Sequence, residues 1–155
     1  MPNKAEIQRR LDSYYWPYHN QIDLLLKNYK SDFGKVLFWD AHSIRRNVKT
    51  IQENPFPDLI LGNNDQKTSG VEYIDIALEN LSSGTFEITH NTPFKGGFIT
   101  RSKGDPSQNI HALQLEMCKD LYMTSNETEY DPIKARSVKK MLKKTFNHLI
   151  VALNA

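Results

Sequence analysis

The sequence contains few of the features that mark secreted, membrane or low-complexity proteins. Its single cysteine, Cys118, cannot form an internal disulfide, so we expect a reducing, cytoplasmic environment. Apolar runs such as residues 24–26 and 36–39 are far shorter than the roughly 18 residues that a membrane span needs. No apolar segment follows a basic start at the N-terminus. We therefore expect neither a membrane span nor a secretory signal.

The composition that remains is typical of one globular domain over residues 1–155. Hydrophobic residues make up 39% of the chain and charged residues 25%, a balance that supports a buried core. The net charge of +2 is too small to indicate a nucleic-acid partner. Basic residues do gather near the C-terminus, at Lys134, Arg136, Lys139, Lys140, Lys143 and Lys144. This segment either binds an acidic surface or is simply solvated on one face of a helix, and we favour the second interpretation.

Helical patterns occupy both ends of the chain. Asn3 and Glu6 have the spacing of a capping box, and apolar residues then recur every three or four positions. Pro17 predicts a break, with a second helix over residues 18–29 and a turn over 31–34. Residues 71–81 and 132–153 also have apolar stripes at helical spacing.

Short apolar runs between these helices predict strands. Residues 35–40 have the continuous apolar character of a strand covered on both faces, and a long polar loop follows over 41–58. Further strands are expected at residues 59–61, 85–89, 97–101 and 110–116. The alternation of helices and strands indicates the α/β class.

Asp40 and His42 close the first strand and are the first candidates for chemistry. Two residues apart on a strand, they face the same way, so the carboxylate can orient the imidazole. Ser43 cannot complete a Ser-His-Asp triad, because adjacent residues on a strand point to opposite faces. In the alternative interpretation His42 only bonds a loop, and Arg45 and Arg46 are solvated.

Glu116 and Arg101 are further candidates. Glu116 ends an apolar run, where it is either a general acid or base or a first-turn carboxylate of a helix over residues 117–123. Arg101 follows the paired glycines Gly96 and Gly97, which suit either close approach to an anionic ligand or an ordinary hairpin. Cys118 is interpreted as a packed thiol.

Together these strings resemble the N-formylglutamate amidohydrolase (N-formylglutamate deformylase) family from about residue 11 onward. Five motifs keep their order: Tyr15-Trp16-Pro17-Tyr18-His19, Phe38-Trp39-Asp40-Ala41-His42-Ser43-Ile44-Arg45, Pro57-Asp58-Leu59-Ile60-Leu61-Gly62, Phe94-Lys95-Gly96-Gly97-Phe98-Ile99-Thr100-Arg101, and His111-Ala112-Leu113-Gln114-Leu115-Glu116 with Leu121-Tyr122-Met123. The resemblance implies a three-layer mixed sheet with flanking helices, of the phosphorylase/hydrolase-like type shared with zinc carboxypeptidases. It also implies zinc-dependent hydrolysis of N-formyl-L-glutamate to formate and L-glutamate in histidine degradation.

The resemblance also implies roles for four residues. His42 matches a zinc ligand, and Glu116 matches the carboxylate that works on water at the metal. Arg45 and Arg101 match positions that meet the carboxylates of the substrate. We therefore expect residues 36–40 and 110–115 to be central strands of one sheet, with all four residues lining one cleft.

Family members carry a further N-terminal region, with a Pro-His-Ser-Gly-type motif and an acidic residue, that supplies the other metal ligands. Nothing like it precedes Leu11 here. We expect the chain to be the C-terminal portion of the domain, truncated at its N-terminus. Alone it should bind zinc weakly and be inactive, since catalytic zinc needs about three protein ligands. It is then one half of a split enzyme that needs a separate N-terminal chain, or a non-catalytic truncated homologue. If it binds zinc tightly, His19, His90 and His111 are the next ligand candidates.

Overall fold

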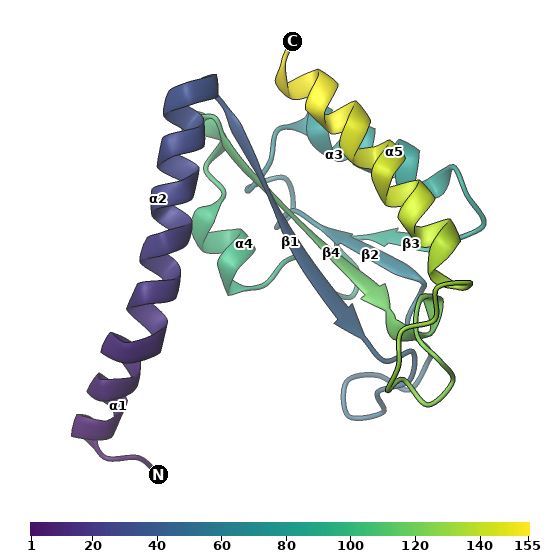
Figure 1. Cartoon of the computed structure of the whole chain (residues 1–155), viewed down its shortest axis with the longest axis horizontal. Coiled ribbons are helices and arrows are strands. Elements are labelled where there is room, and N and C mark those ends of the chain that lie inside the picture. The colour runs from purple at the N-terminus through teal and green to yellow at the C-terminus, as the bar shows by residue number, and fades with distance from the viewer.

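A computed structural model describes all residues 1–155 as an α/β fold around a four-stranded mixed sheet (Figure 1). The order across the sheet is β1-β4-β2-β3, with β1 parallel to β4, β4 antiparallel to β2, and β2 parallel to β3. The strands are β1 (Val36–Ile44), β2 (Leu59–Gly62), β3 (Ile88–His90) and β4 (Ile110–Cys118). The helices are α1 (Lys4–Arg10), α2 (Trp16–Phe33), α3 (Val71–Ser82), α4 (Phe98–Lys103) and α5 (Ala135–Leu153).

The N-terminal helical segment continues through Pro17, where the sequence predicts a break. A π-helical turn over Leu11–Tyr15 joins α1 to α2, so the expected break at Pro17 is wrong. Pro17 lies in the first turn of α2, where the wider turn before it relieves the clash with the preceding carbonyls. The expected cap is confirmed, because the Asn3 side chain accepts a hydrogen bond from the Glu6 amide at 2.9 Å. Gly34 ends the helix in the left-handed conformation, with φ of 77°.

The core lies between one face of the sheet and helices α3 and α5. Strand residues Leu59, Leu61, Leu113 and Leu115 are fully buried there, in the alternation expected of strands. The helices add buried residues at helical spacing, Tyr73, Ile74, Ala77, Leu81, Val138, Met141 and Leu149. The apolar stripes predicted for residues 71–81 and 132–153 are therefore the ones that hold the core together.

Helices α2 and α4 lie outside this core. Both contact β1, and α4 also contacts β4 (Figure 1). His19, Ile22 and Leu26 are the buried residues of α2. Helices therefore flank the mixed sheet, as expected.

Several expected boundaries are wrong. Instead of the strand expected at residues 97–101, Gly97 caps helix α4 and residues 98–101 lie within it, and the strand expected at 85–89 is the short β3. The loop expected from residue 41 begins later, because β1 continues to Ile44. The helix expected over residues 117–123 is reduced to a single 3-10 turn at Lys119–Leu121, since Met117 and Cys118 finish β4. Strand β4 is central as expected, but β1 lies at the edge of the sheet.

Glycines set the position of α4. Gly96 has φ of 116°, which other residues rarely adopt, and Gly97 begins the helix. A Cβ on Gly62 would lie 2.7 Å from the Gly96 nitrogen, so the end of β2 and the loop before α4 are packed backbone against backbone.

Replacing Gly62 by alanine should therefore lower the free energy of unfolding by about 1–3 kcal/mol, the usual cost of overpacking. Gly84→Ala is the matched control, because its Cβ would approach nothing closer than 3.6 Å. Urea denaturation measures both variants. Equal midpoints for the two would contradict the close approach at Gly62.

Candidate active site

The candidate site is built on the pairing of β1 with β4. Asp40 lies opposite Gln114, and His42 lies opposite Glu116. Residues paired in neighbouring strands point to the same face, so these four polar side chains share one face near the carboxyl ends of both strands. The expectation that His42 and Glu116 lie on one face of one sheet is confirmed. On the other side of Glu116, β2 contributes Ile60.

Asp40 orients the His42 imidazole. Its Oδ1 lies 3.0 Å from His42 Nε2, as the two-residue spacing predicts. Its Oδ2 accepts a hydrogen bond from the buried Thr100 hydroxyl at 2.8 Å. The Asp40 side chain is buried, whereas that of His42 is 44% exposed. The imidazole is thus held by Asp40 at Nε2, and the rest of the ring is exposed to solvent.

Gln114 and Thr100 join α4 to the two strands, and neither residue was among the candidates that the sequence predicts. Gln114 Oε1 accepts from the Gly97 amide at 2.5 Å and from Thr100 Oγ1 at 3.4 Å. A lone amide within the apolar stretch 112–115, two positions before Glu116, is the signal that points to Gln114. No local signal points to Thr100, because its partner Asp40 is 60 residues away in the chain.

Glu116 is a buried residue, only 8% exposed; its carboxyl accepts no hydrogen bond from the protein, but neither oxygen is among the fully enclosed atoms without a partner, so the carboxyl keeps contact with solvent. Burial raises its pKa above the ordinary value, and the charge of Asp40 raises it further, while His42 opposes the shift. A carboxyl held this way in a site is suited to proton transfer. Its strand position excludes the interpretation of Glu116 as a first-turn helix carboxylate.

The other histidines are not gathered around His42. His90 lies opposite Leu61 and bonds Asn63, and the His111 Nδ1 accepts from the Gly70 amide at 3.0 Å. Burial lowers the pKa of both imidazoles. His19 packs against Phe98 of α4.

The two candidate arginines already have protein partners. Arg45 is 67% exposed and pairs with Glu127 at 2.8 Å, in a polar pocket that does not include Arg101. Arg101 stands on α4 and donates from Nη1 to the Gly96 carbonyl at 2.6 Å. Arg46, which follows the end of β1, has a structural role, because its guanidinium forms ion pairs with both Asp58 and Asp120.

Metal ligands are incomplete in this chain. His42 has the arrangement of a metal-bound histidine, with a carboxylate on one ring nitrogen and the other nitrogen unpaired. However, no group of three His, Cys, Asp or Glu side chains is placed to hold an ion. Cys118 is not available, since its buried thiol bonds the Pro57 carbonyl and burial raises its pKa to about 11. These residues alone do not fit a catalytic zinc site.

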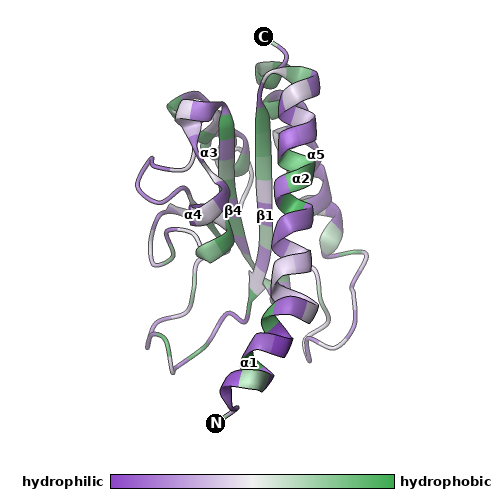
Figure 2. Cartoon of the chain, turned by 90° about the vertical axis from the view of Figure 1, so that its left-hand side faces the viewer, coloured by the Kyte–Doolittle hydropathy of each residue, from purple (hydrophilic) through white to green (hydrophobic).

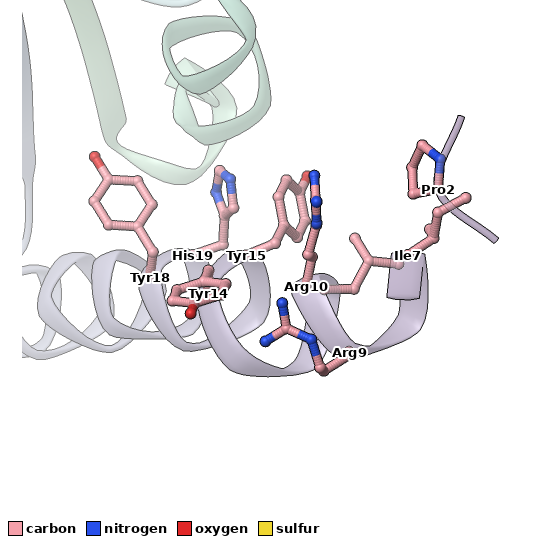
Figure 3. A pocket seen from close by; sticks show the side chains of 9 residues that line it. Pro2, Ile7, Arg9, Arg10, Tyr14, Tyr15, Tyr18 and His19 are labelled. Atoms are coloured by element: carbon pink, nitrogen blue, oxygen red, sulfur yellow. The ribbon is translucent and has the colours of Figure 1, made fainter. Parts of the chain in front are cut away.

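The largest hollow lies elsewhere. It measures about 830 Å³ and follows α1 and the start of α2, where Figure 3 shows its side chains. None of Arg45, Arg101, His42 and Glu116 lines it. No helix is long and apolar enough to cross a membrane.

Thr100→Val should lower the free energy of unfolding by about 1–3 kcal/mol, because it leaves a buried Asp40 oxygen without its donor. Thr100→Ser keeps the hydroxyl and should recover most of this loss. Denaturant titration compares the two variants. If serine and valine are equally destabilising, the hydroxyl is not the donor that Asp40 needs.

Glu116→Gln should raise the melting temperature at neutral pH. The folded-state pKa of Glu116 lies above its unfolded value, so ionisation at high pH favours unfolding, and the variant removes that cost. The difference should shrink as pH falls and vanish below the unfolded pKa of about 4.3. Glu53→Gln, on an exposed loop residue, is the control. A variant less stable than the parent at pH 8 would contradict the described burial.

Comparisons with known proteins identify the family of this chain and agree with its fold. The family model for N-formylglutamate amidohydrolase matches residues 1–123. An N-formylglutamate deformylase from Pseudomonas putida is 36% identical over 131 residues, which cover 81% of this chain and 48% of that protein. One from Pseudomonas aeruginosa is 39% identical over 124 residues, covering 79% and 46%. The chain thus spans about half the length of these curated relatives.

Solved structures extend the comparison to the fold. The N-formylglutamate amidohydrolase of Ralstonia eutropha JMP134 superposes with a TM-score of 0.82 at 26% identity, over 95% of this chain and 54% of that chain. A gene product of Agrobacterium tumefaciens has a TM-score of 0.75 at 12% identity, over 99% and 57%, and so shares the fold. Because the family model covers most of the sequence, this chain belongs to the N-formylglutamate amidohydrolase family.

Proposed function

We propose that this chain supplies one half of the active site of a zinc hydrolase that splits N-formyl-L-glutamate into formate and L-glutamate. The observation that carries the proposal is the buried Glu116 carboxyl beside the oriented His42 imidazole. The names of the relatives support the substrate. The histidine-degradation context, a cytoplasmic location, a truncated N-terminus and the zinc-carboxypeptidase relationship stay predictions.

Glu116 acts as the general base and then the general acid. It takes a proton from a water molecule whose oxygen attacks the formyl carbon. When the bond between that carbon and nitrogen breaks, the same carboxyl returns the proton to the leaving nitrogen. Formic acid and the free amine of glutamate result, formic acid releases its proton to the solvent to become formate, and Glu116 regains its starting state. The raised pKa suits a group that both accepts and donates a proton near neutral pH.

His42 would be one ligand of the zinc, which when bound would supply a Lewis acid for the formyl group. Asp40 keeps one imidazole nitrogen occupied and so presents the other. The remaining ligands come from the half of the domain that lies outside this chain. The curated relatives have room for such a half, since this chain covers less than 50% of each.

Arg45 and Arg101 bind the two carboxylates of the substrate. Guanidinium groups match carboxylates through paired hydrogen bonds. Arg45 is largely exposed, and its partner Glu127 is a carboxylate that the substrate replaces. Arg101 is anchored through Nη1 to the Gly96 carbonyl in the loop that leads to α4.

A second candidate is a non-catalytic homologue that keeps the fold. The absence of a three-ligand group in this structure favours it. Complementation separates the two candidates, because only a half-site gains function when the other half is supplied.

Zinc content and formate release should be measured for the chain alone and with the uncovered part of the Pseudomonas putida deformylase, added as a separate chain or fused. We expect weak zinc binding and no formate from the chain alone, and both zinc and formate after complementation. In the complemented protein, His42→Ala should lose zinc and turnover. Glu116→Gln should keep zinc but lose turnover by about 10²–10⁴-fold.

Arg101→Lys in the complemented protein is the substrate-binding control. It should raise KM and leave zinc content unchanged, since lysine keeps the charge but not the paired hydrogen bonds. Tight stoichiometric zinc with formate release from the chain alone would overturn the half-site. Continued inactivity of a correctly assembled, zinc-loaded complex would favour the non-catalytic homologue.

A further inference from the structure

Helix α5 carries positive charge that no carboxylate of the chain neutralises. It contains five basic side chains and no Asp or Glu, the five being Arg136, Lys139, Lys140, Lys143 and Lys144. All five are exposed, and none of them takes part in an ion pair of the structure. Figure 2 shows hydrophilic and hydrophobic residues alternating along this helix, as expected when only one face lies in the core. The charged face is therefore open to an anion.

Neighbouring charges on this face repel one another. Lys140 lies four residues from both Arg136 and Lys144, about one helical turn in each direction. Lys139 and Lys143 have the same spacing. Like charges at this spacing destabilise a helix, so an anion bound between them would relieve the repulsion.

A hollow of about 360 Å³ lies between α5 and the loop that follows α3, the helix packed beside α5 (Figure 1). Ser137, Lys140 and Lys144 line it from α5, at spacings of three and four that put them on one face of the helix. Ser83 and Thr85 line it from the loop. None of the lining residues is Asp or Glu. Two ammonium groups and three hydroxyls thus surround one hollow.

Lys144 is held at this hollow by an uncharged partner. Its Nζ donates to Ser83 Oγ at 3.3 Å, and the Ser83 hydroxyl donates to the Asn80 carbonyl at 2.8 Å. An ammonium group has three N–H donors, so two remain for a ligand. The chain therefore fixes the position of the ammonium without compensating its charge.

We propose that the hollow between α5 and the loop after α3 binds the phosphate group of a phosphorylated small molecule, with Lys140 and Lys144 as the cationic donors. A phosphate ester has three terminal oxygens and a charge near −2, so it accepts from more donors than a carboxylate does. The volume is within the range of about 300–1,000 Å³ typical of small-ligand pockets and leaves room for the rest of the molecule.

The site is separate from the proposed hydrolysis and does not rest on it. Helix α5 packs on the face of the sheet that carries Leu113 and Leu115. Glu116 and His42 lie on the other face, because side chains alternate along a strand. Ligand binding at α5 therefore needs neither the metal ligands nor the half of the domain outside this chain.

A small ligand agrees better with this surface than a nucleic acid does. The net charge of the chain is only +2, and the opposite face of α5 lies in the core, so the basic surface is one helix wide. Nucleic-acid affinity depends on many cations that neutralise successive phosphates. The hydroxyls instead gather around a single hollow, which suits one phosphate group.

The test uses the 155-residue chain by itself, with inorganic phosphate and pyrophosphate as the probes. Titration calorimetry in about 0.15 M salt should detect saturable binding of one pyrophosphate per chain. Phosphate should bind more weakly, because it carries less charge. Both probes should raise the melting temperature relative to sodium chloride of matched ionic strength, since a ligand of the folded state stabilises it.

Two double variants of equal charge give the matched comparison. Lys140→Gln with Lys144→Gln removes both lysines of the hollow and should weaken pyrophosphate binding by at least about tenfold, the usual worth of one charged hydrogen bond. Lys139→Gln with Lys143→Gln removes the same charge from the same helix outside the hollow. It should weaken binding much less, because salt screens exposed charges that make no contact. All four lysines are exposed, and the unfolding midpoints without ligand verify that both variants fold.

Three results would overturn the phosphate site. One is the absence of saturable binding of either probe at millimolar concentration. Another is an equal loss of affinity in the two double variants, which would reduce the effect to the overall charge of α5. The third is tighter binding to a DNA duplex or to vesicles that contain phosphatidic acid, lost in both double variants alike, which would make a nucleic acid or a membrane the partner.

Discussion

The in-register parallel pairing of β1 with β4 is the contact on which the rest of the site depends. It sets Asp40 beside Gln114 and His42 beside Glu116, so that four polar side chains from distant parts of the chain share one face. A shift by a single residue would turn one strand's pair toward the apolar core of α3 and α5. The leucines on the alternate positions of β4 prevent that shift, because they are fully buried on the core side.

Most of the polar groups at the site have hydrogen-bond partners within the protein, and Glu116 is the informative exception. Asp40 has a partner for each oxygen, and Gln114 accepts from both Gly97 and Thr100. Glu116 accepts no hydrogen bond from the protein, and burial of the residue raises its pKa, so its ionisation costs stability even though its oxygens keep contact with solvent. A cost at one position amid satisfied neighbours is typical of a group retained for chemistry.

Two incomplete features of the molecule, a partial set of metal ligands and an unpaired sheet edge, lie on the same strand. Strand β1 carries His42, whose coordination by this chain alone is incomplete, and it also leaves an unpaired sheet edge under an apolar groove. The chain spans about half the length of its curated relatives.

The sequence by itself determined the elements whose signals are local: the Asn3 cap, the apolar stripes of α3 and α5, the strands that hold His42 and Glu116, and the family. Tertiary structure alone decided that residues 98–101 are helical, because Phe98, Ile99 and Thr100 favour strands by themselves. Backbone packing of Gly62 against residues 95–96 and the Gln114–Gly97 bond override that preference. Strand order and the Thr100–Asp40 bond likewise depend on contacts between residues far apart in the chain, which no local pattern encodes.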